Sequence, residues 1–220
     1  MAGYDLSLAE DRLKVVEFAF VYPMAPHQRR HGPAGYKGYE SYREWLRDDF
    51  SYRCVFSLIR ETWIGRAASF DIDHFKPQSA DPMLVCDYDN LLYLSHRTNL
   101  RKGKLSLPDP GEIALGQCLK VETSGDRIGE VTALNKDGDA IVATLRLNIE
   151  AEVDDRRKWL DVLRAVAVAD EFRFRKLVGF PADLTNLADP QRKKHNTRPD
   201  GILLSAFHRR EVAKNLPEWY

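Results

Sequence analysis

The segment from Phe70 to Lys104 constrains the fold of this chain more than any other part of its sequence. Phe70 and Ile72 alternate with two aspartates, which is the period of a half-buried β-strand. A second apolar run at 91–94 predicts another strand, and the basic stretch that follows is compatible with a helix starting near Ser95. The segment therefore predicts two short strands followed by one helix.

Polar residues stand in a fixed order within this segment: the pair Asp73-His74, then Asn90, then Asn99. Asp73 and Asn99 each offer an oxygen ligand to a hard divalent cation. A neutral histidine beside that cation can take a proton from water near neutral pH. Since a regular strand would point Asp73 and His74 to opposite faces, we expect the strand to end or bulge there. Together these groups are the parts needed to hydrolyse a phosphodiester.

The pattern Asp-His-Phe-x-Pro, then Asn-Leu-Leu, then Asn-x-x-Lys-Gly resembles the HNH nucleases, which have a ββα-metal core. The match covers roughly residues 50 to 104, about a quarter of the chain. The resemblance implies that His74 is the general base and that Asp73 and Asn99 bind Mg²⁺ or Mn²⁺. It also assigns Asn90 to the catalytic set, as the residue that braces the loop. Lys102 matches a lysine of the family that usually lies close to phosphate.

Many HNH proteins carry two Cys-x-x-Cys pairs that bind a structural zinc ion around this core. Here the first pair reads Cys54-Val-Phe-Ser57, and the second reads Ser95-His-Arg-Thr98. A single thiolate among the four positions cannot hold a tetrahedral zinc ion. We therefore expect no structural zinc, and we expect apolar packing by the flanking segments to replace it.

The formal net charge is zero, although proteins that contact phosphates usually carry an excess of Lys and Arg. The basic residues are clustered, and we expect the cluster beside the metal site to bind nucleic acid: Arg97, Arg101, Lys102 and Lys104. A second run without acidic residues contains Arg192, Lys193, Lys194 and Arg198. Such clusters can supply a binding face, but the neutral total predicts weak intrinsic affinity for DNA and delivery by a partner.

The whole chain is expected to have an α+β fold, with a ββα-metal HNH core flanked by other elements. Residues 1–50 predict helices that pack on the core, 51–108 the nuclease core, and 109–220 a β-hairpin with a helical extension. In the last part, strands are expected at 119–123, 130–135 and 140–147. Asp137-Gly138 predicts a two-residue hairpin turn, and a long helix is expected from about Asp154.

The sequence also disfavours some locations. No apolar run approaches the roughly 20 residues that cross a bilayer, so no membrane contact is expected. The first residues lack the basic segment and apolar run of a secretory signal. The 3 cysteines are widely spaced and odd in number, which favours a reducing compartment. We therefore expect a cytoplasmic protein.

The resemblance predicts a metal-dependent endonuclease that hydrolyses DNA. HNH proteins of this size with a C-terminal extension resemble effector nucleases of bacterial anti-phage systems, often paired with an ATPase or sensor subunit. The alternative is a catalytically inactive HNH-like module that binds DNA or protein. The intact Asp-His-Asn set favours the enzyme, because an inactive copy has no chemical need for those three residues.

Overall fold

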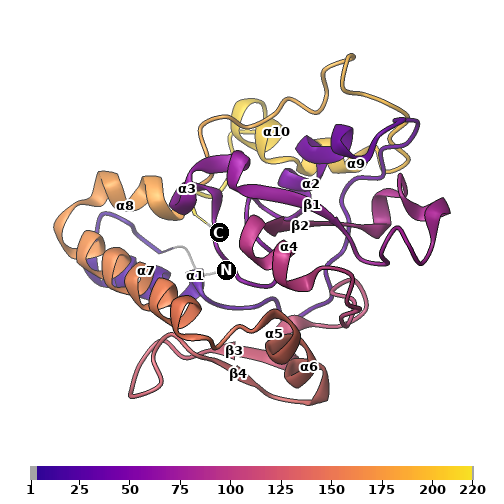
Figure 1. Cartoon of the computed structure of the whole chain (residues 1–220). Helices are drawn as coiled ribbons and strands as arrows, with labels where there is room; N and C mark the ends of the chain where they lie inside the picture. Colours follow the sequence, from indigo (N-terminus) through magenta and orange to yellow (C-terminus); the bar gives the residue numbers. More distant parts are fainter. Residues whose placement is uncertain (1–3, 220) are drawn as a thin grey trace.

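Two short strands and a helix lie at the centre of the computed structural model, which describes residues 4–219 (Figure 1). Strand β1 (Phe70–His74) pairs antiparallel with β2 (Leu91–Ser95), and α4 (His96–Lys102) follows β2 directly. The predicted order of strand, strand and helix is confirmed. The molecule has an α+β fold in which the only sheets of the described residues are two-stranded.

Strand β1 keeps a regular register to its end, with Asp73 opposite Leu92 and His74 opposite Leu91. The strand therefore ends at the Asp-His pair, as one of the two expected alternatives requires, and no bulge interrupts it. The loop that follows, residues 75–90, contains the short 3₁₀ helices η3 (Pro82–Leu84) and η4 (Tyr88–Asn90).

The N-terminal part forms α1 (Ala9–Ala19), η1 (Tyr39–Tyr42), α2 (Arg43–Asp49), α3 (Glu61–Ile64) and η2 (Arg66–Ser69). Helix α2 packs against β2, as expected of a helix that covers the core. Helix α1 instead packs against two C-terminal helices, α7 (Glu150–Ala169) and α8 (Glu171–Val178). Near the two ends of the chain, the rings of Tyr4 and Trp219 pack together with centroids 5.6 Å apart.

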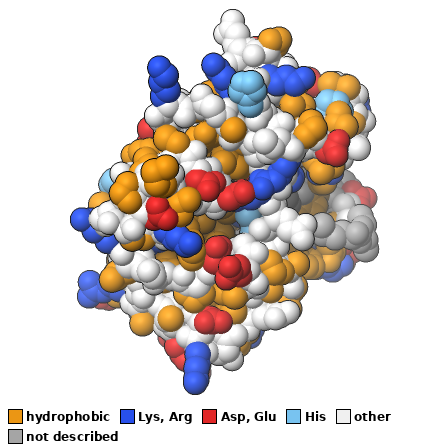
Figure 2. All heavy atoms as spheres, turned by 90° about the vertical axis from the view of Figure 1, so that its right-hand side faces the viewer, with side chains coloured by type: hydrophobic (Ala, Val, Ile, Leu, Met, Phe, Trp, Pro, Cys, Tyr) orange, Lys and Arg blue, Asp and Glu red, His pale blue; other side chains and the backbone are white. Residues whose placement is uncertain are grey.

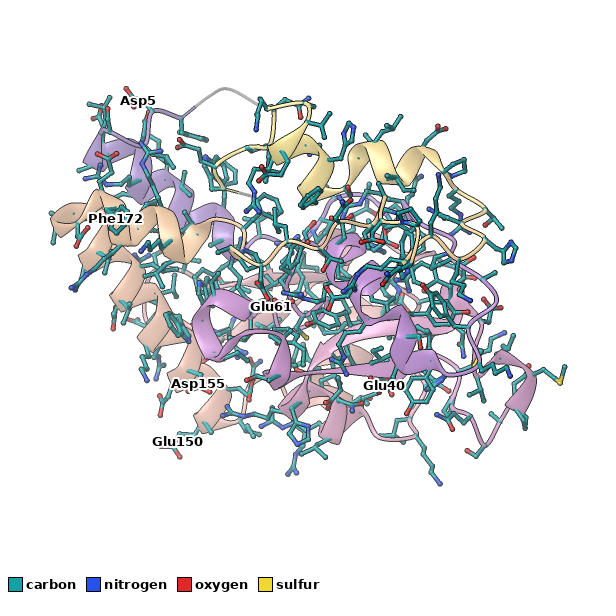
Figure 3. The ribbon with its side chains drawn as sticks, turned by 90° about the horizontal axis from the view of Figure 1, so that it is seen from above. Asp5, Glu40, Glu61, Glu150, Asp155 and Phe172 are labelled. Carbon is teal, nitrogen blue, oxygen red and sulfur yellow. The ribbon has the colours of Figure 1, made fainter. Side chains whose placement is uncertain are left out.

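A buried ion pair fastens the N-terminal helices to the central strands. Arg47 on α2 pairs with Glu61 on α3 at 2.8 Å, and the hydroxyl of Tyr93 on β2 donates a hydrogen bond to Glu61 at 2.8 Å. All three side chains are buried. Glu61 lies in the middle of the molecule when it is viewed from above, whereas Asp155 on α7 lies to one side (Figure 3).

The C-terminal part contains α5 (Leu115–Cys118), β3 (Leu119–Val121), β4 (Val131–Ala133), α6 (Lys136–Leu145), α9 (Asp200–Leu204) and α10 (Ala206–Glu211). Strands β3 and β4 pair antiparallel, so a hairpin forms from the first two of the three expected strands. Its turn lies within 122–130 and not at Asp137-Gly138. The strand expected at 140–147 is wrong, because most of that segment belongs to α6.

Asn135 and Gly138, which surround the expected turn, belong to the start of helix α6. The side chain of Asn135 caps α6 by accepting a hydrogen bond from the Gly138 backbone N–H at 2.9 Å. A Cβ atom on Gly138 would lie 2.1 Å from the carbonyl oxygen of Cys118. Gly138 therefore permits the close packing of α6 on the end of α5, and it does not serve a hairpin turn.

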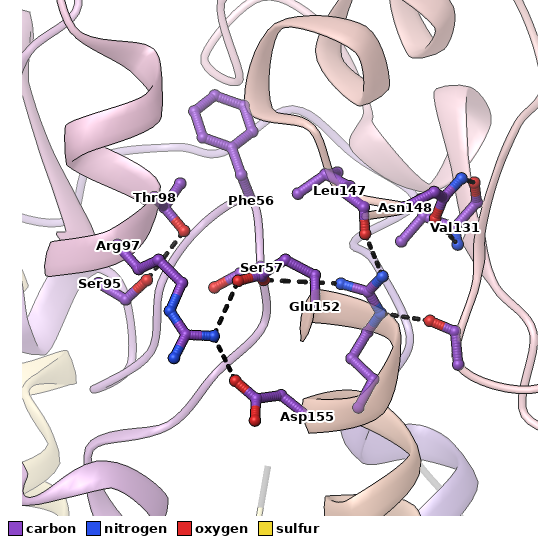
Figure 4. Close-up of polar contacts among 12 residues, drawn as sticks. Phe56, Ser57, Ser95, Arg97, Thr98, Val131, Leu147, Asn148, Glu152 and Asp155 are labelled. Atoms are coloured by element: carbon purple, nitrogen blue, oxygen red, sulfur yellow. Dashed lines mark hydrogen bonds and ion pairs between the residues drawn. The ribbon is translucent and has the colours of Figure 1, made fainter. Parts of the chain in front are cut away.

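The three parts of the chain share one hydrophobic cluster, which includes Trp45, Tyr93 and Phe174. Cys54, one of the positions of the zinc-binding pattern, is fully buried in this cluster. The hydroxyl groups of Ser95 and Thr98, which stand at two further positions of that pattern, hydrogen-bond to each other at 2.8 Å (Figure 4). Among residues 4–219, no helix combines the length and apolar character that a membrane crossing requires.

Candidate active site

An open pocket of about 500 Å³ lies where β1 ends, between the following loop and the end of α4. Both members of the Asp-His pair line this pocket. The full lining is Asp73, His74, Pro77, Gln78, Ser79, Gly103 and Lys104. Asp73 and His74 lie on opposite faces of β1, but they reach one pocket because the strand ends at His74. The end of the strand therefore brings a carboxylate and an imidazole to the same opening.

The hydrogen bonds of His74 define which ring nitrogen is basic. Its Nε2 lies 3.0 Å from the carbonyl oxygen of Val85, which can only accept, so Nε2 carries the hydrogen. In the neutral ring, Nδ1 then holds a lone pair, and the amide nitrogen of Gln78 lies 3.2 Å from it. Tyr39 packs edge-on against the ring with centroids 4.8 Å apart. These three contacts fix the imidazole and turn its basic nitrogen toward Gln78, which lines the pocket.

Asp73 is engaged by a buried lysine. The Lys102 ammonium lies 2.6 Å from Oδ2 of Asp73 and donates a hydrogen bond to the carbonyl oxygen of His74 at 2.9 Å. Burial raises the pKa of Asp73 above its usual value, although Lys102 opposes the shift. Lys102 itself is fully buried. The expectation that Lys102 contacts nucleic acid is therefore corrected, because its charge is used inside the protein to hold the Asp-His pair.

Asn99 on α4 contacts the other aspartate of β1. Its Nδ2 donates to Oδ2 of Asp71 at 2.9 Å, and Nδ1 of His96 lies 2.8 Å from the same oxygen. Asp71 and Asp73 lie on the same face of β1 because they are two residues apart. The Asp71 contact uses the nitrogen of the Asn99 amide and leaves its oxygen out of this bond, and Asn99 is not among the residues that line the pocket of Asp73 and His74.

The predicted ligands suit a hard cation in kind. Asp73 has a second carboxylate oxygen that Lys102 does not pair, and Asn99 has its amide oxygen. Within residues 4–219, no three His, Cys, Asp or Glu side chains are grouped to hold a metal ion. A site built on one carboxylate and one carboxamide, completed by water, does not require such a group, and Mg²⁺ usually keeps several waters.

Asn90 braces the loop between the two strands from within. Its Oδ1 accepts a hydrogen bond from the backbone N–H of Lys76 at 2.8 Å, and its Nδ2 donates to the carbonyl oxygens of Lys76 and Leu84 at 3.2 Å. Asn90 does not line the pocket. It is therefore a positioning residue for the loop that carries Val85 and Gln78, and the expectation that it is itself catalytic is corrected.

Arg97 and Arg101 bind acidic residues of α7. Arg97 lies 3.0 Å from Glu152 and also pairs with Asp155 (Figure 4). Arg101 lies 2.7 Å from the same glutamate. Burial would raise the pKa of Glu152, but hydrogen bonds from Arg101 and Arg97 lower it below its usual value. The two arginines fasten α4 to α7, so they do not form the free basic surface that was expected. Of the four predicted phosphate contacts, Lys104 is the one that is both exposed and part of the pocket lining.

Sequence reasoning missed Val85, Gln78, Tyr39 and Asp71, each of which contacts a predicted site residue. No motif marks the first three, because their contacts depend on how residues 75–90 and the N-terminal segment fold back on β1. Asp71 could have been found, since it shares a strand face with Asp73 and precedes it by two residues.

His27, far from this pocket, gives the protein a testable dependence on pH. Its ring stacks on Phe50 with centroids 4.3 Å apart. Burial lowers the pKa of His27 to about 3, and the positive charges of Arg29, Arg30 and Arg53 add to the shift. Because the folded-state pKa lies below the ordinary value of 6.5, the unfolded chain binds a proton first as the pH falls.

Folding stability should therefore be complete above about pH 6.5 and decrease toward pH 4.5, by about 2 kcal/mol from His27 alone. Urea unfolding of the wild type and His27→Gln at pH 7.0 and pH 4.5 measures this effect. The difference in unfolding free energy between the two proteins should move by about 2 kcal/mol in favour of the variant at the lower pH. The same substitution at the exposed His195 is the control, and an equal difference at both pH values for His27→Gln would contradict the assignment.

Comparison with protein-family models, with curated proteins and with solved structures gave no match. The function is therefore inferred from the residues of the site and their geometry.

Proposed function

We propose that this protein is a metal-dependent HNH endonuclease that hydrolyses DNA phosphodiester bonds with His74 as the general base. The observation that carries the proposal is the hydrogen bond from His74 Nε2 to the carbonyl oxygen of Val85. It leaves the lone pair of Nδ1 on the side of a pocket that Asp73 also lines. An imidazole fixed in this way beside a carboxylate is suited to deprotonate a water molecule.

His74 Nδ1 takes the proton of the attacking water once the Gln78 amide has moved away from this nitrogen. The Val85 carbonyl then stabilises the imidazolium through the Nε2 hydrogen bond. Lys104, exposed at the pocket, is placed to contact a phosphate oxygen.

Asp73 and Asn99 would hold Mg²⁺ or Mn²⁺, which would supply positive charge for the phosphate and the leaving oxygen when bound. Lys102 keeps one oxygen of Asp73 in place and ties it to the backbone of His74. Asp71 holds the amide nitrogen of Asn99, so that the amide oxygen is oriented away from this contact. Residues behind the ligands thus keep them in a defined position, as metal sites generally require.

The alternative function, a catalytically inactive HNH-like module that binds DNA or protein, differs in two measurable properties. The enzyme should convert supercoiled plasmid into nicked or linear DNA with Mg²⁺ or Mn²⁺, and EDTA should stop the reaction. It should also bind Mn²⁺ in a titration, and Asp73→Ala should remove this binding. A protein that shows neither property would be the inactive module.

We further propose a cytoplasmic role as an effector nuclease in an anti-phage system, delivered to DNA by a partner ATPase or sensor subunit. Two observations on charge support this role. The net charge of the chain is zero, and Arg97 and Arg101 form ion pairs with Glu152 on α7. Such a protein should cut DNA weakly by itself at physiological salt, since its net charge is zero. Vigorous digestion by the isolated protein under these conditions would remove the reason for a partner.

A further inference from the structure

We propose that DNA is held by an exposed loop of the C-terminal part, residues 190–197, which we call the basic loop. Its charged residues are Arg192, Lys193 and Lys194. The inference rests on the proposed nuclease function and names the surface that would position its substrate. The surface differs from the cluster on α4 that the sequence pattern favours.

The basic loop has free positive charge. Arg192, Lys193 and Lys194 are all exposed, and in the described part of the chain none of the three forms an ion pair. Arg198, which follows in the sequence, differs from them because it pairs with Asp89 at 2.7 Å. Three adjacent, unpaired cations on one loop are available to a polyanion, whereas the arginines of α4 are already bound to acidic residues.

The basic loop is anchored, although its side chains are exposed. The backbone N–H of Thr197 donates to the carbonyl oxygen of Gly32 at 2.9 Å, and the backbone N–H of Gly32 donates to Asn196 at 2.9 Å. The Tyr36 hydroxyl donates to the carbonyl oxygen of Arg192 at 3.1 Å. A Cβ atom on Gly32 would lie 2.4 Å from the Thr197 hydroxyl, which shows how closely the two segments pack.

The segment that anchors the basic loop also borders the active site. Three residues after Tyr36, the ring of Tyr39 packs against His74. Between them, the carbonyl oxygen of Lys37 accepts a hydrogen bond from the thiol of Cys86, which belongs to the loop between β1 and β2. The basic loop is therefore joined to the catalytic pocket by a short stretch of chain, residues 36–39.

Single lysines continue the positive charge from the basic loop to the pocket. Lys37 belongs to this stretch, Lys76 follows His74 by two residues, and Lys104 lines the pocket. All three are exposed and, within residues 4–219, none forms an ion pair. The basic loop crosses the top of the molecule next to α9 and α10 in Figure 1, and Lys and Arg side chains gather along the upper edge of the face in Figure 2.

DNA is the partner that this arrangement suits. Contacts to phosphates orient a duplex without reading its sequence, and lysine and arginine side chains on loops commonly provide them. A backbone that crosses the basic loop and runs past Lys37 would bring a neighbouring phosphate to the pocket that contains His74. The basic loop also gives a protein of zero net charge a local cluster of three exposed cations that can contact a polyanion.

Binding of a fluorescent DNA duplex of about 30 base pairs, followed by anisotropy between 50 and 200 mM salt, tests the proposal. All proteins carry His74→Ala, so that cleavage does not interfere. The variant Arg192→Ala/Lys193→Ala/Lys194→Ala should bind at least about 10-fold more weakly at 50 mM salt, and the slope of log affinity against log salt should fall by about 2 to 3. The control Lys136→Ala/Arg146→Ala/Lys158→Ala removes the same charge from α6, its C-terminus and α7, and should change affinity less than about 2-fold.

Equal weakening by the two triple variants would overturn the proposal, since only total charge would then matter. Absence of DNA binding by the His74→Ala parent, or tighter binding of an RNA duplex of the same sequence, would overturn it as well. The nuclease proposal fails in a different way: DNA binding that depends on the basic loop, without any metal-dependent cleavage by the protein with His74 intact, would refute the nuclease and support the binding surface.

Discussion

Replacing His74 by alanine is expected to reduce the rate of plasmid cleavage by about 100-fold or more. The reason is that His74 is the base of the proposed site, with its Nε2 hydrogen committed to Val85 and its Nδ1 lone pair turned toward the pocket. Alanine removes the proton acceptor but leaves Asp73 and Lys102 in place. Time courses with Mg²⁺ and with Mn²⁺, at enzyme concentrations that give measurable nicking by the wild type, provide the rates.

His208→Ala is the matched control for this experiment, because His208 lies on α10 and does not line the pocket. The control should cleave at nearly the wild-type rate. DNA binding by the His74→Ala protein should also stay close to wild type, so that the loss is one of chemistry. Equal cleavage by wild type and His74→Ala would refute the role of His74.

Lys102→Met is expected to lower the free energy of unfolding by about 3 kcal/mol, because it leaves the charge of Asp73 without its buried partner. It also removes the hydrogen bond to the carbonyl oxygen of His74. Methionine has a similar length and no charge, so little packing volume is lost. Urea unfolding at pH 7 of the wild type and the variant measures the difference.

The double variant Asp73→Asn/Lys102→Met should regain most of the lost stability, since it removes both charges of the pair. Lys104→Met, at an exposed position beside the same pocket, is the control and should leave stability unchanged. If Lys102 instead served as an exposed phosphate contact, Lys102→Met would weaken DNA binding without a change in stability. That outcome would contradict the buried ion pair.

The central strands and α4 could be predicted because their signals are local. The alternation of apolar and acidic residues around Ile72 and the apolar run before Ser95 define the two strands. The Asp-His pair lies at the end of the first strand, where both side chains can reach one pocket. The sequence therefore identified the neighbourhood of the pocket and the two side chains, Asp73 and His74, that line it.

Contacts between distant parts of the chain account for what could not be predicted. Gly138 reads as a turn residue, but its lack of a side chain serves the packing of α6 against Cys118. Arg97 and Arg101 read as a phosphate-binding cluster, but α7 supplies Glu152 more than fifty residues later and neutralises both. The turn and the strand expected around Gly138 were wrong, because the segment forms α6. Arg97 and Arg101 lie on a helix, as expected, and a tertiary contact gives them a different role.

The two predicted metal ligands, Asp73 and Asn99, show what a sequence motif does not predict. Asp73 and Asn99 were expected to meet around one cation, whereas Asn99 contacts Asp71, and Asp73 contacts Lys102. Lys102 pairs with one carboxylate oxygen of Asp73, and Asp71 accepts a hydrogen bond from the amide nitrogen of Asn99. A motif names the residues but not the neighbours that orient them, and these neighbours decide whether the site can work.

Anomalous diffraction from crystals of the full chain grown with Mn²⁺ tests the central claim most directly. The account predicts one strong peak at the pocket, within about 2.5 Å of a carboxylate oxygen of Asp73 and of the amide oxygen of Asn99, with His74 Nδ1 facing a metal-bound water. The peak should be lost in crystals of Asp73→Ala. No peak at Mn²⁺ concentrations that support cleavage, or a peak that neither Asp73 nor Asn99 can reach, would contradict it.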